Sequence, residues 1–180
     1  MDKVQDILTF WFEQAGEEKW WVKDPDFDAQ IRQRYQDAHT KAAAGQMDHW
    51  MESAEGALAL ILLLDQFPRN IYRGSAFAFA TDEKALNLAR QALEQGYDKA
   101  LSVEQASFFY LPFMHSERLE DQEKCVELFE AISDQVPNLP FAIAHRDVIQ
   151  KFGRFPHRNK VLSRRTTAEE QAYLDDGGGF

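Results

Sequence analysis

Apolar side chains recur at intervals of three and four residues along nearly the whole chain. No stretch has the strict alternation or the clustered β-branched residues that are typical of β-strands. The pattern therefore predicts an all-α protein of about eight helices without a regular sheet. We expect the helices at residues 2–14, 25–44, 53–66, 82–95, 103–116, 119–136, 141–152 and 167–174.

Polar residues at the expected helix starts support these boundaries. Thr81 precedes two acidic residues and is expected to cap the fourth helix. Two further sites have the spacing of a capping box, in which a hydroxyl and a Glu or Gln three residues later satisfy each other's backbone N–H groups. These predicted boxes are Ser102 with Gln105 and Thr166 with Glu169.

One helical domain is expected over residues 1–174, followed by a flexible tail at residues 175–180, where the apolar period stops and a glycine run begins. The fourth and sixth predicted helices are weakly alike, since Leu86 and Ala89 correspond to Cys125 and Leu128. Such similarity at a fixed offset is typical of helical-pair repeats. We therefore expect stacked antiparallel helix pairs of tetratricopeptide-like architecture.

The overall charge limits the classes of partner. The 180 residues carry a net charge of −10, which disfavours binding to nucleic acid and to anionic membranes. The start of the chain is already helical in pattern and lacks a signal peptide's charged leader, and the most apolar run, residues 57–64, is too short to span a bilayer. We expect a cytoplasmic protein.

The chain has one cysteine, Cys125, which falls within an apolar helical pattern and is expected to be buried. An intramolecular disulfide is therefore excluded, and neither a CxxC nor an HExxH spacing occurs. We expect no bound metal and no cofactor.

Two segments share a pattern that helix packing alone does not explain. Residues 66–70 read QFPRN and residues 154–159 read RFPHRN, and each follows an apolar helix that its proline is expected to end. Residues 146–165 contain seven basic residues and one acidic residue. Because guanidinium groups match both carboxylates and phosphates, this basic segment indicates either internal ion pairs or an anion site.

A second group of residues could supply acid and base chemistry. His115 and Glu117 follow the proline-containing fifth helix, and Asp65 precedes the first proline segment. His145 and His157 lie in or near the second segment, although a histidine on an apolar helix face is most often a core residue. Histidine exchanges protons near neutral pH, so these side chains are candidates for catalysis, with no reaction implied.

Five sequence blocks resemble one known family over essentially the whole chain. They are ILTFWF, LALILLLDQFPRNIYRG, FFYLPFMHSE, HRDVIQKFGRFPHRN and SRRTTAEEQAYL. They are similar to the bacterial domain of unknown function 924 family. The resemblance implies a tetratricopeptide-like, all-helical fold and implies no activity, substrate or cofactor. This chain has Ser163-Arg164-Arg165 where the family usually has Leu-Gly-Arg, which weakens Arg164 and Arg165 as site residues.

Most of the family's motif positions are polar in this chain, which favours a site over pure scaffold. Candidate catalytic residues are His115, Glu117, His145 and Asp65, and candidate ligand-binding residues are Gln66, Arg69, Asn70, Arg73, Arg154, His157, Arg158 and Asn159.

Three functions remain open. The first is a polar cleft in which arginines hold a small anionic ligand, with or without acid–base chemistry. The second is a protein-interaction module that holds a peptide in a groove, as helix-pair stacks often do. In the third, the polar positions form a buried network that locks the terminal helices in place.

Overall fold

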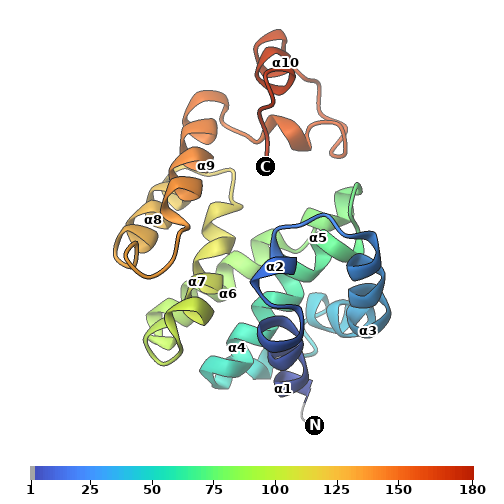
Figure 1. The fold of residues 1–180 in the computed structure, drawn as a ribbon, viewed down its shortest axis with the longest axis vertical. Helices are drawn as coiled ribbons and strands as arrows, with labels where there is room; N and C mark the ends of the chain where they lie inside the picture. The colour runs from blue at the N-terminus through green and yellow to red at the C-terminus, as the bar shows by residue number, and fades with distance from the viewer. Residues whose placement is uncertain (1–2) are drawn as a thin grey trace.

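The computed structural model describes residues 3–180, and this range is helical without a β-strand (Figure 1). The predicted all-α fold is therefore confirmed. No helix in this range is long and apolar enough to cross a membrane. The α-helices are α1 (Lys3–Leu8), α2 (Glu17–Trp20), α3 (Pro25–Ala43), α4 (Ala54–Ile61), α5 (Phe67–Ile71), α6 (Asp82–Glu94), α7 (Val103–Met114), α8 (Leu119–Glu130), α9 (Leu139–Phe152) and α10 (Ala168–Asp175).

Helix α4 lies at the centre of the core. Every side chain from Ala57 to Leu64 is fully buried, and α4 packs against α1, α6 and α7. A helix that is apolar on all sides must be covered on all sides. Helices α1, α6 and α7 therefore cover α4, and the chain leaves its C-terminal end toward the polar region described below.

The predicted stop at Pro68 is wrong, because the chain continues from α4 into α5 through a π-helical turn at Leu62–Gln66. Proline lacks the N–H that would bond to the carbonyl of Leu64 in a regular helix. The Thr81 hydroxyl donates to that carbonyl instead, at 2.6 Å. For this reason the Thr81 side chain does not cap α6, contrary to the sequence prediction.

Other predicted helix ends also differ from the structure. Helix α8 was expected to reach residue 136 but ends at Glu130. The capping box of α10 is formed by Thr167 and Glu170, one residue later than expected. The Thr166 hydroxyl instead lies 3.4 Å from the side-chain nitrogen of Asn159. In the second proline segment, Gly153 ends α9 in the left-handed conformation (φ 67°), three residues before Pro156. The capping box at Ser102 and Gln105 is confirmed.

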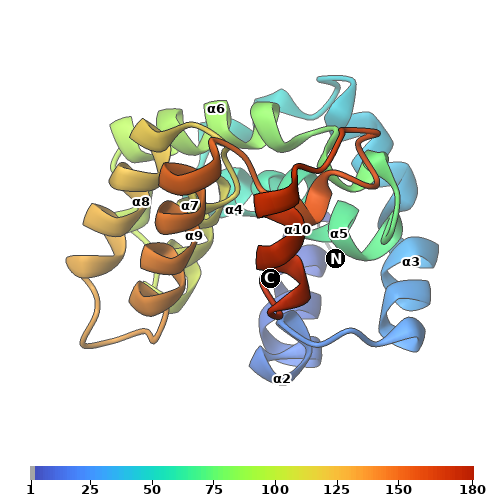
Figure 2. The same cartoon turned by 90° about the horizontal axis from the view of Figure 1, so that it is seen from above.

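The C-terminal part of the chain packs at one end of the molecule. Helices α8 and α9 lie side by side, and α10 follows at the top of Figure 1. Seen from above, α10 lies in front of α4 and α5 (Figure 2). This part has a small apolar cluster of its own, built on Val148, Ile149 and Phe155. A tetratricopeptide-like repeat in this stacking stays a prediction.

Candidate functional site

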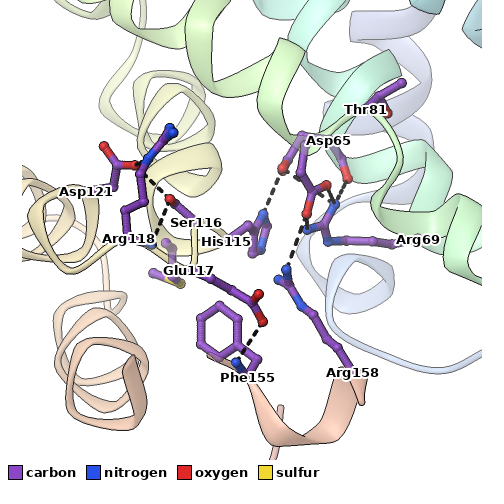
Figure 3. Close-up of polar contacts among 12 residues, drawn as sticks. Asp65, Arg69, Thr81, His115, Ser116, Glu117, Arg118, Asp121, Phe155 and Arg158 are labelled. Carbon is purple, nitrogen blue, oxygen red and sulfur yellow. Dashed lines mark hydrogen bonds and ion pairs between the residues drawn. The ribbon is translucent and has the colours of Figure 1, made fainter. Parts of the chain in front are cut away.

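The π-helical turn places Asp65 at the end of α7, where it meets His115. The Asp65 side chain is fully buried, and its Oδ1 lies 2.8 Å from Nδ1 of His115 (Figure 3). The amide of Gln66 donates to the other carboxylate oxygen at 2.5 Å. His115 directly follows α7. The wider π turn therefore brings together two candidate residues that are 50 positions apart in the chain.

Burial and the neighbouring charges determine the protonation states of Asp65 and His115. Burial lowers the pKa of His115, and the charge of Arg69 lowers it further, while Asp65 offsets part of this. Burial raises the pKa of the Asp65 carboxyl, but His115 and Arg69 together lower it by more. Asp65 is therefore ionised and His115 neutral near pH 7. In the tautomer that donates from Nδ1 to Asp65, Nε2 of His115 carries a lone pair.

The two proline segments meet at Asp82, in the first turn of α6. Arg69 donates two hydrogen bonds to the Asp82 carboxylate, at 2.9 and 3.1 Å. Arg158, from the other segment, reaches the same carboxylate at 3.5 Å. Arg69 also donates to the Asp65 backbone carbonyl. Asp82 therefore links Asp65 and His115 to the C-terminal segment through Arg69 and Arg158.

Arg158 has the weakest polar contacts of the arginines at this place. Its guanidinium lies 4.5 Å from the centre of the Phe79 ring and 4.6 Å from that of Phe155. Its Nε is buried and has no hydrogen-bond partner among the described residues. Burial, and then repulsion by Arg69, lower the pKa of Arg158 to about 10. Arg158 is thus a buried cation with unused N–H donor capacity.

Glu117 attaches the segment that carries Arg158 to the end of α7. Its carboxylate accepts from the backbone N–H of Phe155 at 2.8 Å and from Arg164 at 2.6 and 3.0 Å. Burial raises the pKa of Glu117, but the bonds from Arg164 and Phe155 lower it below its usual value. Arg164, which the resemblance left in doubt, is therefore the main ion-pair partner of Glu117.

These groups surround a pocket of about 360 Å³. Three of the candidate residues line it: His115, Glu117 and Arg158. Figure 3 shows Arg158 extending toward the group formed by Asp65 and Arg69. A neutral imidazole and a buried guanidinium on one wall suit proton exchange with a bound anion. The remaining lining residues are Phe79, Asp82, Glu83, Leu86, Pro112, Ser116, Arg118 and Leu162.

Two candidate residues of the first proline segment lie elsewhere. Arg73 forms two hydrogen bonds with Asp28 of α3, at 2.5 and 2.7 Å. The amide of Asn70 donates to the same carboxylate at 2.8 Å. This pair fastens α5 to α3, and neither residue lines the pocket.

Two candidates of the second segment bind Glu170 of α10 instead of the pocket. Arg154 forms two bonds to its carboxylate, at 2.6 and 2.8 Å. The amide of Asn159 donates to it at 3.2 Å and accepts a bond from Arg164 at 2.9 Å. Together these bonds fix the loop between α9 and α10.

His145 and His157 do not line the pocket, and each ring has its centre 5.6 Å from that of Phe155. Nδ1 of His145 is 2.7 Å from the carbonyl of Phe141, and burial lowers the pKa of His145 to about 3. Burial, and then the charge of Arg158, lower the pKa of His157 to about 4. Nδ1 of His157 is buried without a hydrogen-bond partner in the described part of the chain.

Sequence reasoning missed the acidic partners of the arginines. Asp28, Asp82, Asp121 and Glu170 each lie in the first turn of a helix. Acidic residues there are expected for the helix dipole alone. Asp121 binds Arg90, Arg118 and the Ser116 hydroxyl. The sequence does contain one signal for these partners. Basic residues are concentrated in residues 146–165 while the rest of the chain is acidic, so acidic side chains are available to pair with them.

Within residues 3–180, no three histidine, cysteine, aspartate or glutamate side chains are grouped so as to hold a metal ion.

Comparison with known proteins places the chain in a family. A family model described as "Bacterial protein of unknown function (DUF924)" matches residues 7–178. No curated protein matches the sequence. A solved structure of a protein of unknown function from Agrobacterium tumefaciens, ATU0120, is 46% identical, with 97% of each chain covered and a TM-score of 0.92. The chain belongs to the DUF924 family of bacterial proteins.

Proposed function

We propose that the pocket binds a small anionic ligand, which Arg158 holds while His115 exchanges a proton with it. The observation that carries this proposal is the state of Arg158. Arg158 is 7% exposed, its Nε has no hydrogen-bond partner among the described residues, and its contact with Asp82 is 3.5 Å long. A carboxylate or phosphate in the pocket would accept hydrogen bonds from the guanidinium and compensate its buried charge.

His115 is suited to act as a base on that ligand. Asp65 accepts a hydrogen bond from the Nδ1–H of His115 and orients the ring, so Nε2 can receive a proton from a bound group. A buried carboxylate behind the imidazole also stabilises the imidazolium that forms, as in other catalytic pairs. Asp65 and His115 therefore support proton transfer, and Arg158 supports ligand charge neutralisation.

Thermal melts against inorganic phosphate and a panel of small mono- and dicarboxylates test the binding. A ligand at a hundredfold excess over its dissociation constant stabilises the folded protein by about 2.7 kcal/mol. We expect at least one anion to raise the melting temperature of the wild type. Arg158→Gln should abolish that increase.

Arg165→Gln is the matched control, because Arg165 lies in the same basic segment but is exposed. This variant should keep the full ligand response. An equal loss of response in both variants would show that the effect comes from overall charge and not from the pocket.

A second candidate function is an interaction module in which the polar residues lock the helices. The saturated ion pairs of Arg73, Arg154 and Arg164 favour it. On this account Arg158 is one more lock residue, and no anion stabilises the protein. Arg158→Gln would then destabilise the ligand-free protein, by about 3 to 5 kcal/mol if Asp82 lost an essential partner.

A further inference from the structure

Residues 176–180 fold back onto α9 and place the ring of Phe180 against His145. The two rings are nearly parallel, at 15°, and their centres are 3.5 Å apart. Phe180 also meets Phe155 and His157 edge-on, with ring centres 6.2 and 6.0 Å away. Three aromatic side chains thus form a slot around one ring, which remains 55% exposed.

Two hydrogen bonds and two glycines fix the turn that carries Phe180. The backbone N–H of Gly178 donates to the carbonyl of Tyr173 at 2.9 Å, and that of Gly179 donates to the Tyr173 hydroxyl at 3.1 Å. A Cβ at Gly178 would lie 2.4 Å from the Tyr173 carbonyl oxygen, which is closer than any side chain tolerates. Gly179 has a φ of 128°, a conformation that L residues rarely adopt.

The walls of the slot are uncharged. His145 uses Nδ1 to bond the Phe141 carbonyl, and its buried ring is neutral at physiological pH. Phe155 is fully buried. The edge-on contacts that Phe155 and His157 make stabilise an aromatic guest more than an aliphatic one of similar size.

We propose that His145, Phe155 and His157 form a binding slot for an aromatic side chain, and that Phe180 occupies this slot reversibly as a plug within the same chain. This inference rests on the ring contacts of Phe180 and not on the proposed anion pocket. The glycine run allows the turn that places Phe180 in the slot. Its flexible backbone also allows Phe180 to leave the slot. A short linker also gives the ring a high effective concentration, of millimolar order, so a slot with a dissociation constant about tenfold lower is mostly filled.

The test uses the full-length chain with the plug removed. Phe180→Ala empties the slot directly, and Gly178→Ala empties it by preventing the turn. The probe is the blocked peptide acetyl-Gly-Gly-Gly-Phe-amide, followed by NMR shifts of the His145 ring. We expect both variants to bind the peptide about tenfold more tightly than the intact chain, which its own plug protects.

Two controls define the site. The peptide acetyl-Gly-Gly-Gly-Leu-amide should bind more weakly, and His145→Ala combined with Phe180→Ala should lose the binding. The inference is overturned if neither plug variant binds the phenylalanine peptide, or if the leucine peptide binds equally well. It is also overturned if the His145 ring signals of Phe180→Ala match those of the wild type, since the ring would then not be stacked on Phe180.

Discussion

The imidazole of His115 and the carboxylate of Asp65, which stand 50 residues apart in the chain, meet at 2.8 Å behind the pocket. The contact exists because a π-helical turn widens the helix at Leu62–Gln66. Single π turns inside α-helices are frequent at functional sites. Here the turn places the buried carboxylate of Asp65 beside His115, which lines the pocket.

The first prediction concerns the proton on this pair. We expect His115 at pH 7 to be the neutral tautomer protonated at Nδ1, as observed by ¹⁵N NMR. Asp65→Asn should lower the pKa of His115 further, because Asp65 is a group that raises it. A wild-type ring protonated mainly at Nε2, or a higher pKa in the variant, would rule out the proposed hydrogen bond.

The second prediction concerns the Thr81 hydroxyl, which donates to the backbone carbonyl that Pro68 cannot bond. Thr81→Val leaves the buried carbonyl of Leu64 without its donor, which should cost about 1–3 kcal/mol of unfolding free energy. Thr40→Val is the matched control, since exposed Thr40 bonds only the carbonyl of Gln36 in its own helix. Urea denaturation measures both. Equal stabilities of the two variants would mean that the π turn does not depend on Thr81.

Helix periodicity predicted the fold well, but it could not predict the π turn. The apolar pattern through residues 54–66 is that of a regular helix, and the proline that follows reads as a stop. What keeps the helix intact is a hydroxyl 17 positions away from the carbonyl it satisfies. Local sequence rules contain no such partner, and Thr81 looked like an ordinary helix cap for the same reason.

The candidate site was predicted in part. The residues that converge on the pocket, His115, Glu117 and Arg158, were among the candidates, but so were Arg73 and Arg154, which do not line it. The sequence shows which residues are basic and cannot show which carboxylate each one meets. Asp82 was assigned only a helix-dipole role, although it joins Arg69 to Arg158.

The third prediction concerns the ion pair between Arg154 and Glu170. Glu170 is 3% exposed and needs its partner, so Arg154→Met should destabilise the C-terminal part by about 1–3 kcal/mol. Hydrogen exchange should report faster opening of α10, with α4 unchanged. Glu170→Gln should cost less, because it leaves no buried charge behind. Uniform acceleration over all helices would contradict a local lock.

The fourth prediction is a pH dependence of stability caused by His145. Its pKa in the folded protein is about 3, below the value of about 6.5 expected in the unfolded chain. Between these values the unfolded chain binds the extra proton, so stability is full above pH 6.5 and falls as the pH drops. By pH 5 the loss from this residue should be about 2 kcal/mol.

His145→Gln removes this titrating group and should reduce the loss of stability between pH 7 and pH 5 in urea denaturation, while His115 and His157 keep their own contributions. His49→Gln is the control, since His49 is exposed. If the two variants lost stability by the same amount between these pH values, His145 would not be the neutral buried group described here.

The fifth prediction tests the central claim, that Arg158 is the anchor of an anion pocket. The Nε–H of Arg158 is buried and has no hydrogen-bond partner in residues 3–180, so its ¹H–¹⁵N NMR signal, assigned by its absence in Arg158→Gln, reports on an anion that binds the guanidinium. Titration with the anion that gives the largest thermal shift should move this signal downfield and saturate at the same concentration as the thermal effect. A signal that stays in place while the anion stabilises the protein would contradict the account.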